Sequence, residues 1–214
     1  KDRQTILFSA TMPQKIQQLA RTILNNPVEV KLAVSKPADK IQQSAYVCYE
    51  AQKLPLIKHL FKAQRPERVI IFTGSKIKTK DLAVSLSRAG FNVCAMHSDL
   101  AQSERDEAMY AFRAGKVDVP VATDIVARGI DIDDIQLVIN YDVPHDEEDY
   151  VHRIGRTARA GRNGRAITLV NEKDQYKFRQ IERFLEKDVE KAAMPAELGE
   201  GPAYGNKTEK QERK

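Results

Sequence analysis

Short apolar runs alternate with longer amphipathic stretches from residue 41 to residue 187. The short runs predict β-strands, and the VIIF core of residues 69–72 is apolar throughout, which suits a strand buried on both faces. The longer stretches predict helices, two of which should end at Gly90 and Gly115. Predicted strands span 43–49, 68–73, 92–96, 118–122, 137–141 and 166–170, and predicted helices span 53–62, 78–89, 102–114 and 176–186. This alternation predicts an α/β fold with a parallel sheet covered by helices on both faces.

The first 40 residues follow a different pattern. An apolar run at 4–8 predicts a short strand, and Pro13 opens a helical pattern that continues to Leu24. Residues 28–32 alternate as a strand would, and 35–40 resemble an exposed linker. Because a lone strand and helix cannot form a sheet by themselves, we expect this segment to belong to a domain whose remainder lies upstream.

The pattern changes again after Lys187. Prolines and glycines interrupt residues 195–205, and residues 206–214 are almost wholly charged or polar. Such a composition predicts a flexible basic tail over 188–214. Its basic residues could touch nucleic acid, and a solvated tail is the alternative.

Composition narrows the class of protein. The chain has 214 residues, a net charge of +5 and a pI near 9.1, which permit a nucleic-acid partner without requiring one. Cys48 and Cys94 stand alone, so the sequence suggests neither a disulfide framework nor a metal site. No apolar run has the length of a membrane span, and we therefore expect a cytoplasmic protein without a membrane partner.

A basic stretch at 152–165 reads HRIGRTARAGRNGR, with an arginine at every third position from 153 onward. On a helix such a series winds round the axis, so only neighbouring pairs could converge. Arg156 and Arg159 would present two planar guanidinium groups to one side, which suits phosphate oxygens. A solvated basic face, with the acids of 142–149 as helix-dipole partners, is the alternative. Glycines at 155, 161 and 164 each cost about 1 kcal/mol of helix propensity, which favours anion binding.

Three predicted strand ends mix hydroxyl, small and basic residues, at 73–76, 97–105 and 123–131. In open α/β sheets the working residues lie in loops at the carboxyl ends of the strands. Backbone amides and hydroxyls there could approach a sugar-phosphate chain without reading its bases. Taken singly, Ser75 and Thr123 suit cap or turn positions. Together the three loops predict a groove that binds a nucleic-acid backbone.

Five motifs occur in the order and spacing of the DEAD-box RNA helicases, and the chain resembles that family. They are Ser9-Ala10-Thr11, VIIFTGS at 69–75, Gln102-x-x-Arg105, ATDIVARGID at 122–131 and HRIGRTARAGR at 152–162. The resemblance covers nearly the whole chain to about Lys187 and implies a RecA-like fold. It implies the end of the first RecA-like domain at 1–26, an interdomain linker at 27–42 and the helicase C-terminal RecA-like domain at 43–187. The segment after Glu186, with GEGPAY at 199–204, resembles the bacterial RhlE-like subgroup.

The resemblance implies roles in ATP use for several residues. Arg156 and Arg159 are similar to the arginines that reach ATP phosphates across the interdomain cleft. Asp131 is similar to the aspartate that contacts the nucleotide ribose. The residues implied to couple ATP turnover to RNA binding and duplex opening are His152, Ser9 and Thr11.

The resemblance also implies RNA contacts. Five positions match family residues that hold RNA phosphates and 2′-hydroxyls, namely Ser75, Arg105, Thr123, Arg128 and Gly129. These positions fall in the groove that the strand ends predict.

Two absences concern catalysis. The chain contains no GxxxxGK[ST] loop and no Asp-Glu-Ala-Asp run. The resemblance therefore implies that ATP and Mg²⁺ are held mainly by an upstream RecA-like domain. It predicts the C-terminal half of an ATP-dependent RNA helicase that binds RNA backbone, closes on ATP and locally unwinds short duplexes. We expect this chain alone to be inactive.

Two other functions share the fold. A non-catalytic RNA-binding scaffold would need eroded catalytic motifs, whereas Arg156, Arg159 and Asp131 are intact. A DNA-directed helicase of the wider superfamily 2 would share the sheet but usually not this set of motifs.

Two residues depart from the family pattern. Ala158 stands where glycine is usual, and we expect its methyl group to be tolerated. Pro120 lies inside a predicted strand, where it removes a ladder donor, so the strand is expected to bulge or start late.

Overall fold

The structure is a computed structural model that describes residues 3–8, 14–30, 41–127, 135–158 and 163–205. It divides into two compact units, Lys1–Ser35 and Lys36–Lys214, each of which is considered by itself.

The first unit contains helix α1, Gln14–Ile23, as the sequence predicted. The strand predicted at 4–8 is wrong, because residues 3–8 have no regular structure. Residues 28–30 also form no strand, and the rest of that predicted strand lies outside the described residues. Phe8 and Val28 are 89% and 91% exposed. An apolar alternation forms a strand only where another strand pairs with it.

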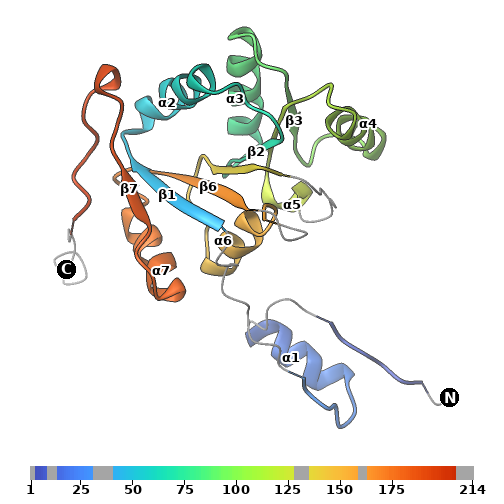
Figure 1. Cartoon of the computed structure of the whole chain (residues 1–214). Helices are drawn as coiled ribbons and strands as arrows, with labels where there is room; N and C mark the ends of the chain where they lie inside the picture. Colours follow the sequence, from blue (N-terminus) through green and yellow to red (C-terminus); the bar gives the residue numbers. More distant parts are fainter. Residues whose placement is uncertain (1–2, 9–13, 31–40, 128–134, 159–162, 206–214) are drawn as a thin grey trace. The chain divides into compact units, whose positions relative to one another are not determined.

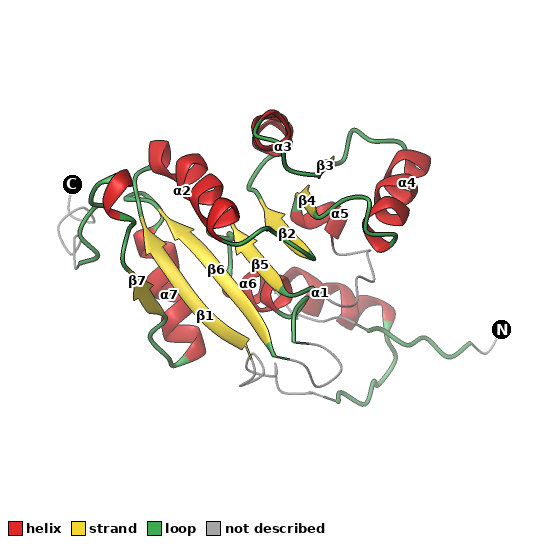
Figure 2. Cartoon of the chain, turned by 45° about the horizontal axis from the view of Figure 1, so that its top comes forward, coloured by secondary structure: helices red, strands yellow, loops and turns green. Residues whose placement is uncertain are grey.

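The second unit contains a parallel sheet of seven strands, in the order β3-β4-β2-β5-β6-β1-β7 (Figure 2). The strands are β1 Ile41–Val47, β2 Val69–Phe72, β3 Val93–Met96, β4 Val119–Ala122, β5 Leu137–Asn140, β6 Gly164–Val170 and β7 Glu190–Ala192. Each pairing between neighbouring strands is parallel. The predicted α/β fold is confirmed.

Helices cover both faces of this sheet (Figure 1). They are α2 Glu50–Ala63, α3 Lys76–Arg88, α4 Gln102–Arg113, α5 Asp124–Ala127, α6 Glu147–Ile154, α7 Gln175–Leu185 and the 3₁₀ helix η2 Ala196–Leu198. Because strand side chains alternate, adjacent residues of β2 enter different cores. Ile71 packs in one cluster with residues of α2 and α3, and Phe72 packs in another with residues of α4, α6 and α7.

Two glycines end helices as the sequence predicted. Gly90 follows α3 with φ +87°, and Gly115 follows α4 with φ +71°. This left-handed conformation is the one that glycine adopts without a steric cost.

Pro120 delays one pairing of β4. Strand β4 pairs with β3 from Val119 onward, with Pro120 opposite Cys94. Its pairing with β2 begins only at Val121, opposite Ile71. The expected late start is therefore confirmed on the side that faces β2, where a missing N–H group interrupts the ladder.

The prediction of a flexible tail is wrong for residues 188–205. Strand β7 pairs with β1, and the Gln175 side chain donates to the Ala203 carbonyl at 2.9 Å. The Tyr204 hydroxyl donates to Glu182, and its ring packs edge-on against Phe178. A Cβ atom on Gly201 would lie 1.9 Å from the Val47 carbonyl oxygen, so glycine permits this close approach. Glycines and prolines that suggested disorder instead shape a packed segment; residues 206–214 lie outside the described residues.

Candidate functional site

The carboxyl ends of β3, β4, β2 and β5 form one rim of the sheet, because these parallel strands are neighbours. Backbone hydrogen bonds join the loops that leave it. The Thr73 amide donates to the Ala122 carbonyl at 3.0 Å, and the Thr123 amide donates to the Met96 carbonyl at 3.2 Å. The structure therefore brings together the three loops that sequence analysis selected, and Ser75, Arg105 and Thr123 belong to this rim.

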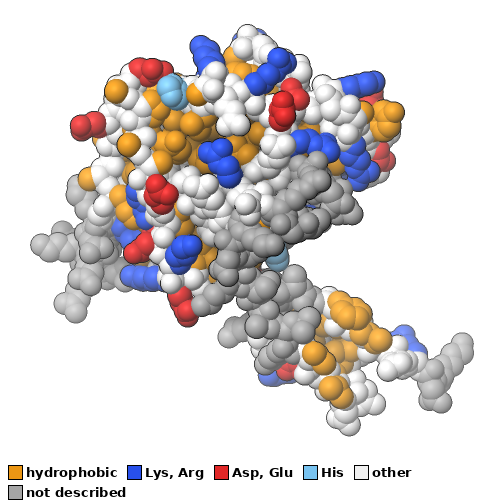
Figure 3. Space-filling model, viewed as in Figure 1, with side chains coloured by type: hydrophobic (Ala, Val, Ile, Leu, Met, Phe, Trp, Pro, Cys, Tyr) orange, Lys and Arg blue, Asp and Glu red, His pale blue; other side chains and the backbone are white. Residues whose placement is uncertain are grey.

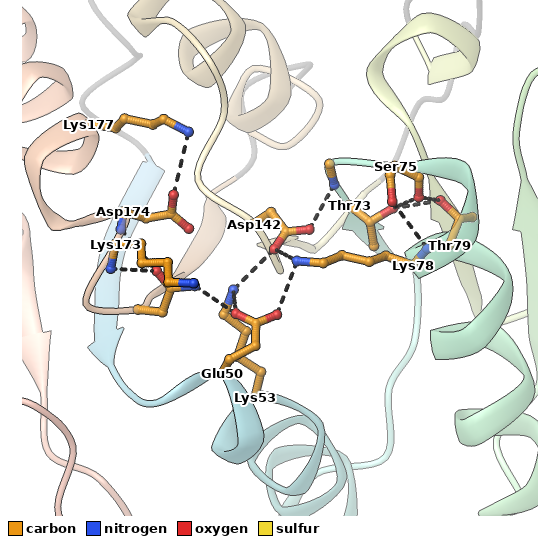
Figure 4. Close-up of polar contacts among 12 residues, drawn as sticks. Glu50, Lys53, Thr73, Ser75, Lys78, Thr79, Asp142, Lys173, Asp174 and Lys177 are labelled. Atoms are coloured by element: carbon orange, nitrogen blue, oxygen red, sulfur yellow. Dashed lines mark hydrogen bonds and ion pairs between the residues drawn. The ribbon is translucent and has the colours of Figure 1, made fainter.

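Ser75 caps helix α3. Its Oγ accepts from the Lys78 amide at 3.3 Å, and its carbonyl oxygen accepts from the Thr79 hydroxyl at 3.0 Å (Figure 4). The alternative role as a cap is thus confirmed for this residue. Because a capping hydroxyl uses an oxygen lone pair, the exposed Ser75 hydroxyl keeps its own proton for a further acceptor.

Arg105 forms a hydrogen bond with the loop after β3. Its Nη2 donates to the Ser98 carbonyl at 3.0 Å, so the guanidinium group lies against the loop. Its buried Nε and the Nδ1 of His97, which is 4% exposed, have no hydrogen-bond partner in the described part of the chain. Burial, reinforced by Lys80, lowers the pKa of His97, which favours its neutral form. Buried polar atoms without a partner are rare in folded proteins, so these two atoms set the loop apart from the rest of the rim.

Basic side chains of α3 extend the rim. Lys76 and Lys80 reach Asp99, in the loop after β3, at 3.0 and 3.2 Å. On the face drawn in Figure 3, Lys and Arg side chains lie over α3 and α4, interspersed with acidic and hydrophobic ones. This mixed surface has the charge to attract a polyanion but is not a continuous basic patch.

Helix α6 positions His152 and Arg156. Its N-cap is Asp146, which accepts from the Asp149 amide at 2.7 Å, and the helix ends at Ile154. Glu147, Glu148 and Asp149 lie in its first turn, where acids complement the helix dipole. Asp142 does not, because it lies before the helix and pairs with Lys53 and Lys78. The arginine series does not continue on a helix, however, because Arg156 follows the C-cap and lies in a turn. The glycine after Ile154 ends the helix, which sequence analysis counted only as a loss of helix propensity.

Arg156 is held beside a small surface pocket. The next residue, Thr157, is 2% exposed and donates from its hydroxyl to the Ile135 carbonyl at 2.5 Å, which anchors the turn. The pocket is lined by Phe72, Asp124, Ala127, Asp149, His152, Arg153 and Arg156. His152 and Arg156 therefore line the same small pocket.

Arg153 has a structural role that the sequence did not reveal. Its Nε and Nη2 donate to the two carboxylate oxygens of Asp124 at 2.6 and 2.7 Å. Its Nη1 donates to the Asp142 carbonyl at 2.8 Å, and the guanidinium group lies 5.1 Å from the centre of the Phe72 ring. At 3% exposure this arginine is unavailable to a ligand. A sequence signal for this burial existed. Arg153 lies on the face of α6 that also buries Tyr150 and Ile154.

Ala158 adopts a left-handed conformation, with φ +59°. This explains why glycine suits the position, since an alanine there carries a cost of about 1–2 kcal/mol. Gly164 lies close by, because a Cβ atom on it would be 2.6 Å from the Ala158 nitrogen.

A partly buried cluster of charged side chains lies behind the rim, and no sequence motif predicted it. The Asp142 carboxylate accepts from Lys53 at 3.1 Å, from Lys78 at 2.7 Å and from the Gly74 amide at 2.8 Å. Glu50 contacts the same two lysines at 2.8 and 3.1 Å. Burial opposes ionisation of Asp142, but the two lysines and the Gly74 amide outweigh it and lower the pKa of this carboxyl.

Several predicted site residues lie outside the described residues, namely Ser9, Thr11, Arg128, Gly129, Asp131 and Arg159. Their roles stay predictions. Within the described ranges, no group of His, Cys, Asp and Glu side chains could hold a metal ion, and no helix is long and apolar enough to cross a membrane.

Residues 52–161 match the family described as the helicase conserved C-terminal domain. Over 204 residues the chain is 38% identical to a probable ATP-dependent RNA helicase, DDX23, of Homo sapiens, covering 94% of this chain and 25% of that protein. It is 38% identical to the DEAD-box ATP-dependent RNA helicase CshA of Geobacillus kaustophilus, covering 91% and 42%. The chain spans a quarter to a half of the length of the curated relatives it matches.

Two solved structures resemble the chain. The E. coli DEAD-box protein SrmB, bound to the regulator of ribonuclease activity A, is 37% identical with a TM-score of 0.70, and the match covers 76% of this chain and 96% of the SrmB chain in that structure. S. cerevisiae Dbp5, bound to RNA and ADP BeF3, is 32% identical with a TM-score of 0.76, covering 86% of this chain and 50% of Dbp5. These similarities confirm the predicted RecA-like fold.

Proposed function

Because this chain belongs to the DEAD-box RNA helicases and carries their C-terminal domain, we propose that it is half of an RNA-dependent ATPase that locally unwinds short RNA duplexes. The other half is an upstream RecA-like domain, which holds most of the ATP and the Mg²⁺. We assign the protein to the cytoplasm and to the bacterial RhlE-like subgroup, on the GEGPAY segment at 199–204.

We place the domain boundaries near those that the sequence motifs imply. Residues 1–26 belong to the end of the first RecA-like domain, 27–42 form the linker and the C-terminal domain begins at 43. Its end lies near residue 205 and not at 187, because β7 and Tyr204 pack on the domain.

On the nucleotide side, Arg156 and Arg159 stabilise the charge that develops on the transferred phosphate, and Asp131 contacts the ribose. The position of Arg156 supports this assignment. Arg156 and His152 line the same small pocket, and the hydrogen bond of the next residue, Thr157, to the Ile135 carbonyl anchors the turn that carries Arg156. His152 links ATP occupancy to RNA occupancy, and Ser9 and Thr11 couple ATP turnover to duplex opening.

On the RNA side, the rim binds phosphates and 2′-hydroxyls without reading bases. The residues proposed to contact RNA are Ser75, Arg105, Thr123, Arg128 and Gly129. The observation that supports this assignment is that three loops meet at one rim, where Ser75 is exposed and Arg105 lies against the loop after β3.

The mechanism that follows is a clamp. ATP and RNA each bind the closed arrangement of two domains better than the open one, so each favours closure and the binding of the other. A strand bent within the groove cannot remain base-paired, and hydrolysis then reopens the cleft.

The proposal predicts a strict dependence of ATP hydrolysis on RNA and on both domains. The full-length protein should hydrolyse ATP at least about tenfold faster with single-stranded RNA than with DNA of the same sequence, and the 214-residue chain alone should not exceed background. Phosphate release measured with each nucleic acid tests this. Equal stimulation by DNA would indicate a DNA-directed helicase, and RNA binding without hydrolysis would indicate a scaffold.

A further inference from the structure

Asp142 connects the four loops and helices that surround the rim. It follows β5, and at 7% exposure it is nearly buried. One carboxylate oxygen accepts from the Gly74 amide in the loop after β2, and the other accepts from Lys53 of α2 and Lys78 of α3 (Figure 4). Its main-chain carbonyl accepts from Arg153 of α6.

The cluster around Asp142 has a buried centre, formed by Asp142 and Lys53, and a half-exposed edge, formed by Glu50 and Lys78. Lys53 is fully buried, so its ammonium group depends on the carboxylates of Asp142 and Glu50. Two lysines face two carboxylates, and Asn171 donates to Glu50 at 2.7 Å. The contact between Lys53 and Asp142 favours one geometry, because moving either group away would leave a buried charge without its partner.

This geometry fixes the loop that presents Ser75. Asp142 holds the Gly74 amide on one side of Ser75 and the Lys78 ammonium group on the other, while the Lys78 amide binds Ser75 Oγ. A Cβ atom on Gly74 would lie 3.4 Å from the Asp142 oxygen, an ordinary van der Waals distance, so the loop packs directly against this carboxylate. Asp142 thus determines where the exposed hydroxyl and the start of α3 stand relative to the neighbouring loops.

We infer that Asp142 is a positioning residue for RNA, which holds the Gly74–Ser75 loop of the rim in the shape that binds the RNA backbone. The inference rests on the proposed function. It assigns the side chain of Asp142 to the RNA side, while its main-chain carbonyl supports Arg153 and thereby the segment that carries Arg156. A side-chain substitution can therefore separate the two.

The test is Asp142→Asn in the full-length protein. An amide has one acceptor oxygen, so it cannot accept from the Gly74 amide and from both lysines, and its NH₂ group opposes one of these donors. The RNA concentration that gives half-maximal ATPase should rise about tenfold, the scale of one lost charged hydrogen bond. The maximal rate and the KM for ATP should stay within about twofold, because the Arg153 contact is retained.

Glu182→Gln is the matched control. Glu182 is also 7% exposed and also has three donors, namely the Val189 amide, Lys191 and the Tyr204 hydroxyl, but it lies on α7, next to the C-terminal segment. It should lower the melting temperature as Asp142→Asn does and leave the RNA requirement unchanged. If both variants raise the RNA requirement equally, or neither does, Asp142 is only a stabilising residue and the inference is overturned.

A milder variant covers the case in which Asp142→Asn does not fold. Lys78 has a half-exposed side chain, and Lys78→Gln removes its 2.7 Å contact with Asp142. It should raise the RNA requirement about threefold, and an unchanged requirement would overturn the inference. Loss of RNA stimulation in the wild-type protein would instead refute the proposed function.

Discussion

Replacing Arg159 with alanine is expected to reduce RNA-stimulated ATP hydrolysis by the full-length protein about a thousandfold, the lower end of the effect of an arginine finger. The guanidinium group is proposed to stabilise charge that develops on the transferred phosphate, so its loss acts on the transition state. RNA binding should remain measurable, since the RNA contacts are assigned to other residues. Steady-state phosphate release and RNA binding by fluorescence anisotropy measure the two effects.

Arg165→Ala is the control for this variant. Arg165 belongs to the same series of arginines, but it lies exposed on β6. Its replacement should leave ATP hydrolysis near the wild-type rate. Wild-type turnover by Arg159→Ala would refute the assignment of this arginine.

Replacing Arg153 with alanine is expected to destabilise the domain by about 3–5 kcal/mol, because removal of one partner leaves a buried ion pair unmatched. Asp124 would lose both of its short hydrogen bonds, and the carbonyl of Asp142 would lose a donor. Urea unfolding of the 214-residue chain, followed by circular dichroism, gives the change in the free energy of unfolding.

The exposed Arg165 again provides the comparison, since its replacement by alanine should change the free energy of unfolding by less than about 0.5 kcal/mol. Arg153→Lys should fall between the two, because an ammonium group cannot bind both carboxylate oxygens as the guanidinium fork does. Equal unfolding curves for wild type and Arg153→Ala would show that the bidentate pair contributes nothing.

Strands β1 to β6 and helices α2, α3, α4 and α7 were predictable because their local pattern and their tertiary environment agree, whereas α5, α6, β7 and η2 were not predicted. The VIIF run of β2 is apolar on both faces and does separate two cores. The predicted strand at 4–8 failed for the opposite reason, since its apolar pattern has no neighbouring strand among the described residues. The segment after 187 failed because its order comes from distant contacts, such as Tyr204 with Glu182, that local composition does not contain.

The candidate site was predictable where a motif names the residue and unpredictable where only packing does. Ser75 and Thr123 were selected because each follows a buried strand whose carboxyl end lies on the same rim of the sheet. Arg153 and Arg156 could not be told apart by spacing, and their difference arises from the end of α6 at Ile154, which buries one and places the other in a turn. Asp142 and Lys53 are 89 positions apart, so no local pattern joins them.

The most direct test of the account is an experimental structure of the full-length protein with a non-hydrolysable ATP analogue and single-stranded RNA. The account predicts that the guanidinium groups of Arg156 and Arg159 lie about 3 Å from phosphate oxygens, with the RNA backbone against Ser75 and Thr123. A nucleotide bound while both guanidinium groups point away from it, or RNA bound at another surface, would contradict the account.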